Sequence, residues 1–148
     1  MKTVKQGVSE CFPAACAALS GQPLADILRA AAHVVGIADW QGKPEEWHSR
    51  IWSNPIRCNT AFSYLCSAYL SGITLQQLHL AYGSTSNERE LPPGRGVVTF
   101  IKPGLRHILA YADGMLCVSD VGQPDYMTLS EYLAATGFEA EKIISELN

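Results

Sequence analysis

The sequence predicts an α+β fold in a single domain, residues 1–148, with a helical part up to about residue 82 and an antiparallel sheet from about residue 95. Apolar residues recur at helical spacing through the first part. After the polar stretch 83–94 the periodicity changes to β-rich runs, and Asp113-Gly114 between two of them is a strong hairpin signal. A chain of 148 residues is long enough to bury one hydrophobic core without disulfides or metals.

The first two helices are bounded by proline and glycine. Pro13 suits a first helical turn, because its missing N–H would be unpaired there anyway, so Cys11 lies at or just before the start of a helix, and Gly21 ends that helix. A second helix is expected up to Gly36, since apolar residues recur at helical spacing before it: Leu24, Ile27, Leu28, Ala31 and Val35. His33 lies on this helix, and we expect it to be a surface or partly buried residue rather than a catalyst.

Two further helices are expected in the first part. Asn59 or Thr60 caps the third helix, whose apolar stripe ends at Gly72. Thr74 caps a shorter fourth helix, Leu75 to Tyr82. The polar stretch that follows this helix is a surface loop by composition, and it separates the helical part from the sheet.

All three tryptophans fall in the segment 39–55, where Pro44 and the two acids after it look like a short helix start. Trp40, Trp47 and Trp52 either cover the core beneath an irregular connection or form an aromatic rim for a peptide substrate. Core cover is the interpretation we prefer.

The second part carries three β-rich runs, expected as strands over residues 96–101, 106–112 and 115–119. Thr128 and Glu131 form a capping box that opens a short helix to about Ala135, and Gly137 ends it. The tail 138–147 fits either a helix or a last strand, and both stay open.

The composition describes an ordinary globular protein, with 47% hydrophobic and 17% charged residues. The net charge is −3 and the basic residues are scattered, which argues against a nucleic-acid partner. No apolar run approaches the roughly 18 residues that a membrane span needs, and the N-terminus lacks the apolar segment of a signal peptide. We therefore expect a cytoplasmic protein without a membrane partner, with export by a specialised secretion machine left open.

The five cysteines indicate free thiols. They are Cys11, Cys16, Cys58, Cys66 and Cys117, an odd number without a C-x-x-C pair. Neither they nor the four histidines pair at zinc-ligand spacing. A redox role would need a resolving thiol near Cys11, and Cys16 is poorly placed because it lies inside the same helix. We expect no disulfide, no metal and no cofactor.

Cys11 is the candidate nucleophile. At the start of a helix, unpaired backbone N–H groups and the positive end of the helix dipole stabilise a thiolate and so raise its nucleophilic fraction. Most cysteines in cytosolic domains are inert, so Cys11 alone would carry little weight. The case for catalysis depends on the other end of the chain.

His107 and Asp120 supply the remaining parts of such a site. A thiolate nucleophile benefits from an imidazole that exchanges its proton, and the imidazole needs a third group to orient it. His107 opens one strand of the predicted hairpin and Asp120 follows the partner strand, so the turn at Asp113-Gly114 brings them to the same open end. Gln6 precedes Cys11 by five residues, and its amide could join the Cys11 N–H in stabilising an oxyanion.

These residues resemble the motif order of papain-like cysteine peptidases: Gln6, then Cys11 followed by Pro13-Ala14-Ala15, then a histidine on a strand, a hairpin and an aspartate. Within that family the chain most resembles the bacteriocin-processing peptidases that cut double-glycine leaders, and their stand-alone relatives. The similarity covers the two ends of the chain. The resemblance implies a papain-like fold with Gln6 as oxyanion-hole donor and Cys11 as nucleophile. It also implies His107 as general base and acid, oriented by Asp120.

Three positions depart from the family pattern. Phe12 stands where a glycine usually follows the nucleophile, Arg106 where a glycine often precedes the histidine, and Val121 where a proline commonly follows the aspartate. We expect Phe12 to narrow or reshape the cleft. Substrate preference is therefore not carried over from the family.

We expect a cysteine peptidase that cleaves a peptide or isopeptide bond through a thioester on Cys11, with a peptide or protein as its substrate. The active site would lie in the groove between the helical part and the sheet. Two alternatives stay open. One is an acyltransferase or deamidase with the same triad. The other is a non-catalytic module that binds a partner through the tryptophan-rich segment and the loop 83–94.

Overall fold

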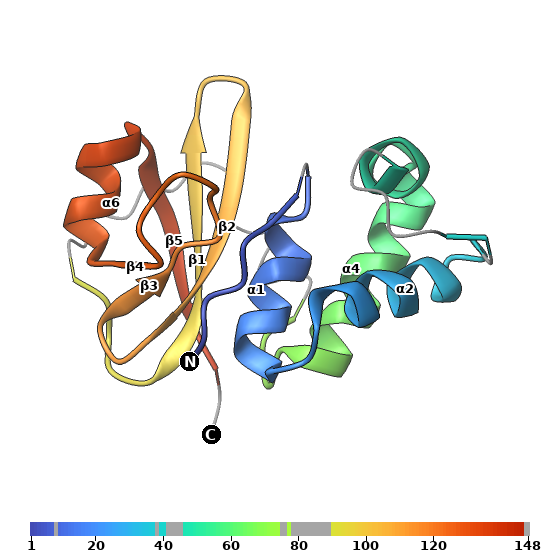
Figure 1. The fold of residues 1–148 in the computed structure, drawn as a ribbon, viewed down its shortest axis with the longest axis horizontal. Helices are drawn as coiled ribbons and strands as arrows, with labels where there is room; N and C mark the ends of the chain where they lie inside the picture. The colour runs from blue at the N-terminus through green and yellow to red at the C-terminus, as the bar shows by residue number, and fades with distance from the viewer. Residues whose placement is uncertain (8, 38, 41–45, 75–76, 78–89, 147–148) are drawn as a thin grey trace.

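The computed structural model describes residues 1–7, 9–37, 39–40, 46–74, 77 and 90–146 (Figure 1). It confirms the α+β class, because helices in the first part pack against a five-stranded antiparallel sheet in the second. The helices are α1 (Cys11–Ser20), α2 (Leu24–Val34), the π-helix η1 (Trp47–Trp52), α4 (Pro55–Tyr69) and α6 (Leu129–Thr136). The strands are β1 (Arg95–Lys102), β2 (Leu105–Ala112), β3 (Met115–Cys117), β4 (Tyr126–Met127) and β5 (Glu139–Ser145).

The sheet has the order β4-β3-β2-β1-β5. The predicted hairpin is confirmed: Ala112 pairs with Met115, and the turn residues Asp113 and Gly114 have φ of 52° and 82°, as a type I′ turn requires. The tail, which fitted a helix or a strand, forms β5 and pairs antiparallel with β1. Strand β4 was not predicted, because two residues are too few to show a period.

Helices cover both faces of the sheet (Figure 1). Helix α6 packs on one face, where its Leu129 and Tyr132 join Val98 and Leu109 in a buried cluster. Helix α1 packs on the other face against β2, and α2 and α4 lie beyond it. Alternation along the strands accounts for the two sides, since Val97 faces the helical part while its neighbour Val98 faces α6.

Helix α1 is central to the fold because it is apolar all round. Every residue from Phe12 to Leu19 is buried, and four of these eight are alanines, which let α2, α4 and β2 approach closely. Gly21 ends the helix with φ of 74°, as expected. A buried, rigid helix of this kind holds its first residue, Cys11, in a fixed position beside the sheet.

The start of α4 was predicted wrongly. The helix begins at Pro55, not after Asn59 or Thr60, and Asn54 is its cap: Asn54 Oδ1 accepts from the N–H groups of Ile56 and Arg57, both at 3.1 Å. The Asn-Pro pair is the better signal, since proline suits the first helical position.

Other helix signals have mixed outcomes. The capping box of Thr128 and Glu131 is confirmed at the start of α6. Thr74 and Gln77 cap each other reciprocally, at 2.8 and 3.2 Å, but the helix expected over 75–82 otherwise falls outside the described residues. Pro44 also falls outside them.

The core-cover interpretation is confirmed for two of the three tryptophans. Trp47 is fully buried and Trp40 is 8% exposed, so both cover the core, which was the preferred interpretation. Trp52 is only partly buried, and it lines a pocket.

Over the part of the chain that the structure describes, no helix has the length and apolar character to cross a membrane. All five cysteines are free thiols.

Replacing Asn54 by alanine tests where α4 begins. We expect Asn54→Ala to lower the free energy of unfolding by about 1 kcal/mol, because two N–H groups lose their acceptor. Thr60→Ala is the matched control, since Thr60 is exposed within the helix and alanine suits that position. Urea unfolding followed by circular dichroism measures both, and a larger loss in Thr60→Ala would contradict the observed boundary.

Candidate active site

Cys11 is the first residue of α1 and is partly exposed. The first helical hydrogen bond runs from Ala14 N–H to Glu10 O at 2.9 Å. The Cys11 N–H therefore belongs to the first turn, whose N–H groups have no acceptor within the helix. Ser9, two residues before, has a positive φ of 58°, and its carbonyl accepts a hydrogen bond from Trp52 Nε1 at 2.6 Å. Trp52 therefore fixes the turn that presents Cys11.

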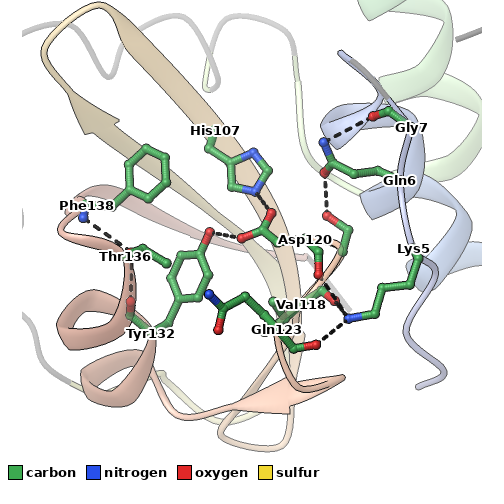
Figure 2. Close-up of polar contacts among 11 residues, drawn as sticks. Lys5, Gln6, Gly7, His107, Val118, Asp120, Gln123, Tyr132, Thr136 and Phe138 are labelled. Carbon is green, nitrogen blue, oxygen red and sulfur yellow. Dashed lines mark hydrogen bonds and ion pairs between the residues drawn. The ribbon is translucent and has the colours of Figure 1, made fainter.

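The structure brings His107 and Asp120 together as the hairpin predicted. The β2–β3 ladder ends at the pair Ala110–Cys117, and three residues further His107 Nε2 lies 2.6 Å from Asp120 Oδ1 (Figure 2). Because Nε2 is engaged by the carboxylate, Nδ1 is the ring nitrogen left for Cys11. The Cys11 thiol lies close enough to His107 to raise the pKa of the imidazole, and both line one pocket, which places the thiol, the imidazole and the carboxylate in one chain of neighbouring groups.

The charges of this chain favour a protonated imidazole. Burial opposes protonation of His107, but hydrogen bonds to Asp120 and Cys11 outweigh it and raise its pKa from 6.5 to about 9. For Asp120, burial would raise the pKa, but hydrogen bonds from His107 and Tyr132 outweigh it and lower the pKa below the usual 3.8. The pair is therefore ionised at neutral pH.

Tyr132 holds the second oxygen of this carboxylate. Its hydroxyl donates to Asp120 Oδ2 at 2.5 Å. Burial, together with the neighbouring carboxylate, raises the pKa of Tyr132, so the hydroxyl stays a donor. Sequence reasoning missed Tyr132, because a tyrosine on the buried side of a short helix looks like an ordinary core residue.

Lys5 holds the loop that carries Asp120. Its Nζ donates to the carbonyls of Val118, Asp120 and Gln123 at 2.9, 3.2 and 3.0 Å (Figure 2). It also lies 3.2 Å from the Asp125 carboxylate. The sequence gives no signal for this role, since a lysine near an N-terminus looks like a solvated residue.

Phe138 restrains the imidazole from the other side. Its ring stacks on His107 with centroids 5.7 Å apart and an interplanar angle of 18°. Lys102 Nζ lies over the same Phe138 ring, 4.4 Å from its centroid. Two contacts therefore hold His107: Asp120 binds a nitrogen of its ring, and Phe138 stacks on the face of the ring.

Gln6 lies beside the loop that leads to Asp120. Its backbone N–H donates to Ser119 O at 3.0 Å, and its side-chain Oε1 accepts from Ser119 Oγ at 2.6 Å. The amide orientation follows, because Oε1 is engaged and Nε2 must point the other way, toward Gly7 O at 3.4 Å (Figure 2). The hydrogen bond to Gly7 O is long, and an amide nitrogen carries two N–H donors. Gln6 Nε2 therefore has a second N–H besides the one that points to Gly7 O. Gln6 is thus oriented by Ser119, a buried residue that sequence reasoning missed.

A pocket of about 280 Å³ lies beside Cys11 and His107, between the helical part and the sheet. The residues that line it are Cys11, Phe12, Trp52, Phe62, Thr99, Arg106, His107, Ile108 and Glu141. The Phe12 ring is 1% exposed and stacks on Phe62 with centroids 4.5 Å apart. Phe12 therefore shapes the pocket as part of an aromatic wall.

Two other histidines lie apart from this chain of residues. His33 is on α2, and His48 Nδ1 lies 3.3 Å from Ser9 Oγ. Within the described ranges, no three His, Cys, Asp or Glu residues are grouped as a metal ion would need.

The comparisons with known proteins add nothing to this geometry. No protein-family model matches the chain, and neither a curated protein nor a solved structure gives a match.

Removing the carboxylate of Asp120 tests the electrostatics. In Asp120→Asn we expect the pKa of His107 to fall from about 9 toward 6.5. Burial lowers this pKa, and the variant loses the carboxylate that raises it against burial. NMR titration of the histidine ring protons measures it, with Asp125→Asn as the matched control, since Asp125 contacts Lys5 instead.

The same change alters the pH dependence of stability. A folded-state pKa above 6.5 means that protonated His107 stabilises the fold fully below pH 6.5, and that this stabilisation is lost as the pH rises through about 9. The gap in unfolding free energy between wild type and Asp120→Asn should therefore narrow over that range. An unchanged His107 pKa in Asp120→Asn would contradict the pairing.

Proposed function

We propose that this chain is a papain-like cysteine hydrolase, a peptidase that cleaves a peptide or isopeptide bond at Cys11. The observation that carries the proposal is the hydrogen-bonded chain of His107, Asp120 and Tyr132, with the Cys11 thiol next to the imidazole in the same pocket. A nucleophile, a proton carrier and an orienting acid in contact are what acyl transfer through a thioester needs. The order of Gln6, Cys11, His107 and Asp120 supports the family resemblance.

In the first step, the Cys11 thiolate attacks the carbonyl carbon of the scissile bond and a C–S bond forms. The negative charge moves to the carbonyl oxygen. Protonated His107 gives its proton to the leaving amine as the C–N bond breaks, which leaves a thioester and a neutral imidazole.

In the second step, water attacks the thioester carbonyl while neutral His107 takes a proton from it. The C–S bond breaks, the acid product leaves, and the thiolate with protonated His107 is restored. Asp120 stays ionised throughout and keeps the imidazole oriented.

The oxyanion of both steps would be stabilised by the Cys11 N–H and the Gln6 amide. Ser119 supports this role, because its hydroxyl engages Gln6 Oε1 and so orients the amide, whose Nε2 carries a second N–H besides the one that points to Gly7 O. Donors fixed before the reaction stabilise the transition state without reorganisation.

The proposal predicts Cys11-dependent cleavage of peptides. Wild type incubated with a peptide library from digested proteins should give new peptide termini, detected by mass spectrometry. Cys11→Ala and His107→Ala should abolish them, because they remove the nucleophile and the proton carrier. Cys58→Ala is the matched control, since Cys58 is a similarly half-buried thiol on another helix.

The same spectra separate the alternatives. A glutamine that gains about one dalton without new termini would indicate a deamidase that uses the same thioester. A library with no Cys11-dependent product of either kind would contradict the proposal and favour a binding module.

A further inference from the structure

The pocket beside Cys11 has two unlike sides. From the helical part come the aromatic rings of Phe12, Trp52 and Phe62, and Trp52 and Phe62 lie with centroids 4.6 Å apart. From the sheet comes an ion pair, in which Arg106 donates to Glu141 Oε1 at 2.7 Å. Glu141 is only 3% exposed. A carboxylate this buried is unusual beside aromatic walls and calls for a physical reason.

A β-bulge accounts for the position of Glu141. Thr99 pairs with Lys142, whereas the next residue, Phe100, pairs with Ala140, so Glu141 is the extra residue of β5. The bulge breaks the alternation of the strand, which lets Ala140 face α6 while Glu141 lines the pocket on the other face. Bulges of this kind occur next to functional sites, where they redirect a side chain.

One oxygen of Glu141 lacks a hydrogen bond. Oε2 is buried and has no partner among the described residues. A buried carboxylate oxygen without a donor is costly, because it has lost its water without a replacement. Glu141 lines the pocket, but Oε2 is closed to water in this structure, so a donor from a ligand would reach it after a rotation of the Glu141 carboxylate and would then remove that cost.

The charge of the pair selects the kind of donor. Arg106 already neutralises Glu141, so a cationic side chain would leave an uncompensated charge among aromatic groups, and an anionic one would meet the carboxylate. A neutral side chain that donates through a flat amide fits both the free oxygen and the rings of Trp52 and Phe62.

We infer that this pocket binds a substrate side chain that ends in a neutral carboxamide, glutamine or asparagine, with its amide N–H on Glu141 Oε2. The inference rests on the proposed function, because it concerns the residue that lies in the pocket while Cys11 attacks a neighbouring bond. It makes Glu141 and Arg106 the residues that determine specificity.

The peptide library provides the test. At one position near the cleaved bond, glutamine or asparagine should be enriched over all other residues. Synthetic peptides that differ only there should then be cleaved with kcat/KM at least about tenfold higher for glutamine than for glutamate, lysine or methionine, because only the amide pairs with the buried oxygen.

The double variant Arg106→Met, Glu141→Met removes both partners of the ion pair, which avoids leaving one buried charge alone. Its preference should shift from glutamine to methionine at the same position. Glu139→Gln is the matched control, since Glu139 is exposed on the same strand and should keep the preference for glutamine.

Two failures are distinguishable. If wild type cleaves peptides without favouring glutamine or asparagine, or if the double variant keeps that preference, the inference is overturned and the peptidase proposal stands. If no Cys11-dependent cleavage occurs, the proposed function fails and the inference fails with it. The alkylation rate of Cys11 with iodoacetamide, measured on each variant, separates lost reactivity from lost recognition.

Discussion

The 2.6 Å hydrogen bond between His107 and Asp120 is the interaction on which the candidate site depends. It joins the open ends of a hairpin, and it raises the pKa of a buried imidazole that burial alone would keep neutral. The surrounding contacts serve this pair, since Tyr132 holds the second carboxylate oxygen and Phe138 covers the ring. Without the pair, Cys11 would be an isolated thiol at a helix start.

The N-terminal segment connects the two halves of the site. Lys5 and Gln6 are adjacent in sequence, and both bind the stretch around Ser119 and Asp120, Lys5 through backbone carbonyls and Gln6 through the Ser119 hydroxyl. The same segment leads within five residues into Cys11 at the start of buried α1. Cys11 and Asp120 are therefore positioned by one continuous stretch of chain, which explains how groups more than a hundred residues apart in sequence keep a fixed geometry.

Local sequence signals predicted most of the helices and strands, whereas contacts between distant elements decided the features of the site that the sequence did not predict. The predicted hairpin placed His107 opposite Asp120, because a two-residue turn fixes the register of the strands it joins. The position of Cys11 at a helix start followed from the proline and the alanines that come after it. The start of α4 was missed because Asn54 and Asn59 are chemically equivalent caps in sequence. The bulge at Glu141 carries no local signal either, since it arises where β5 adjusts to β1. Buried partners such as Tyr132 and Ser119 become visible only when distant elements meet.

The most direct test of the account is the rate at which iodoacetamide alkylates each cysteine of the folded protein at pH 6. Because protonated His107 next to the thiol would stabilise a thiolate, Cys11 should react at least about tenfold faster than Cys58, whose pKa burial raises, and His107→Ala should remove that advantage. A Cys11 that reacts no faster than Cys58, or that keeps its rate in His107→Ala, would contradict the existence of a thiolate–imidazolium pair.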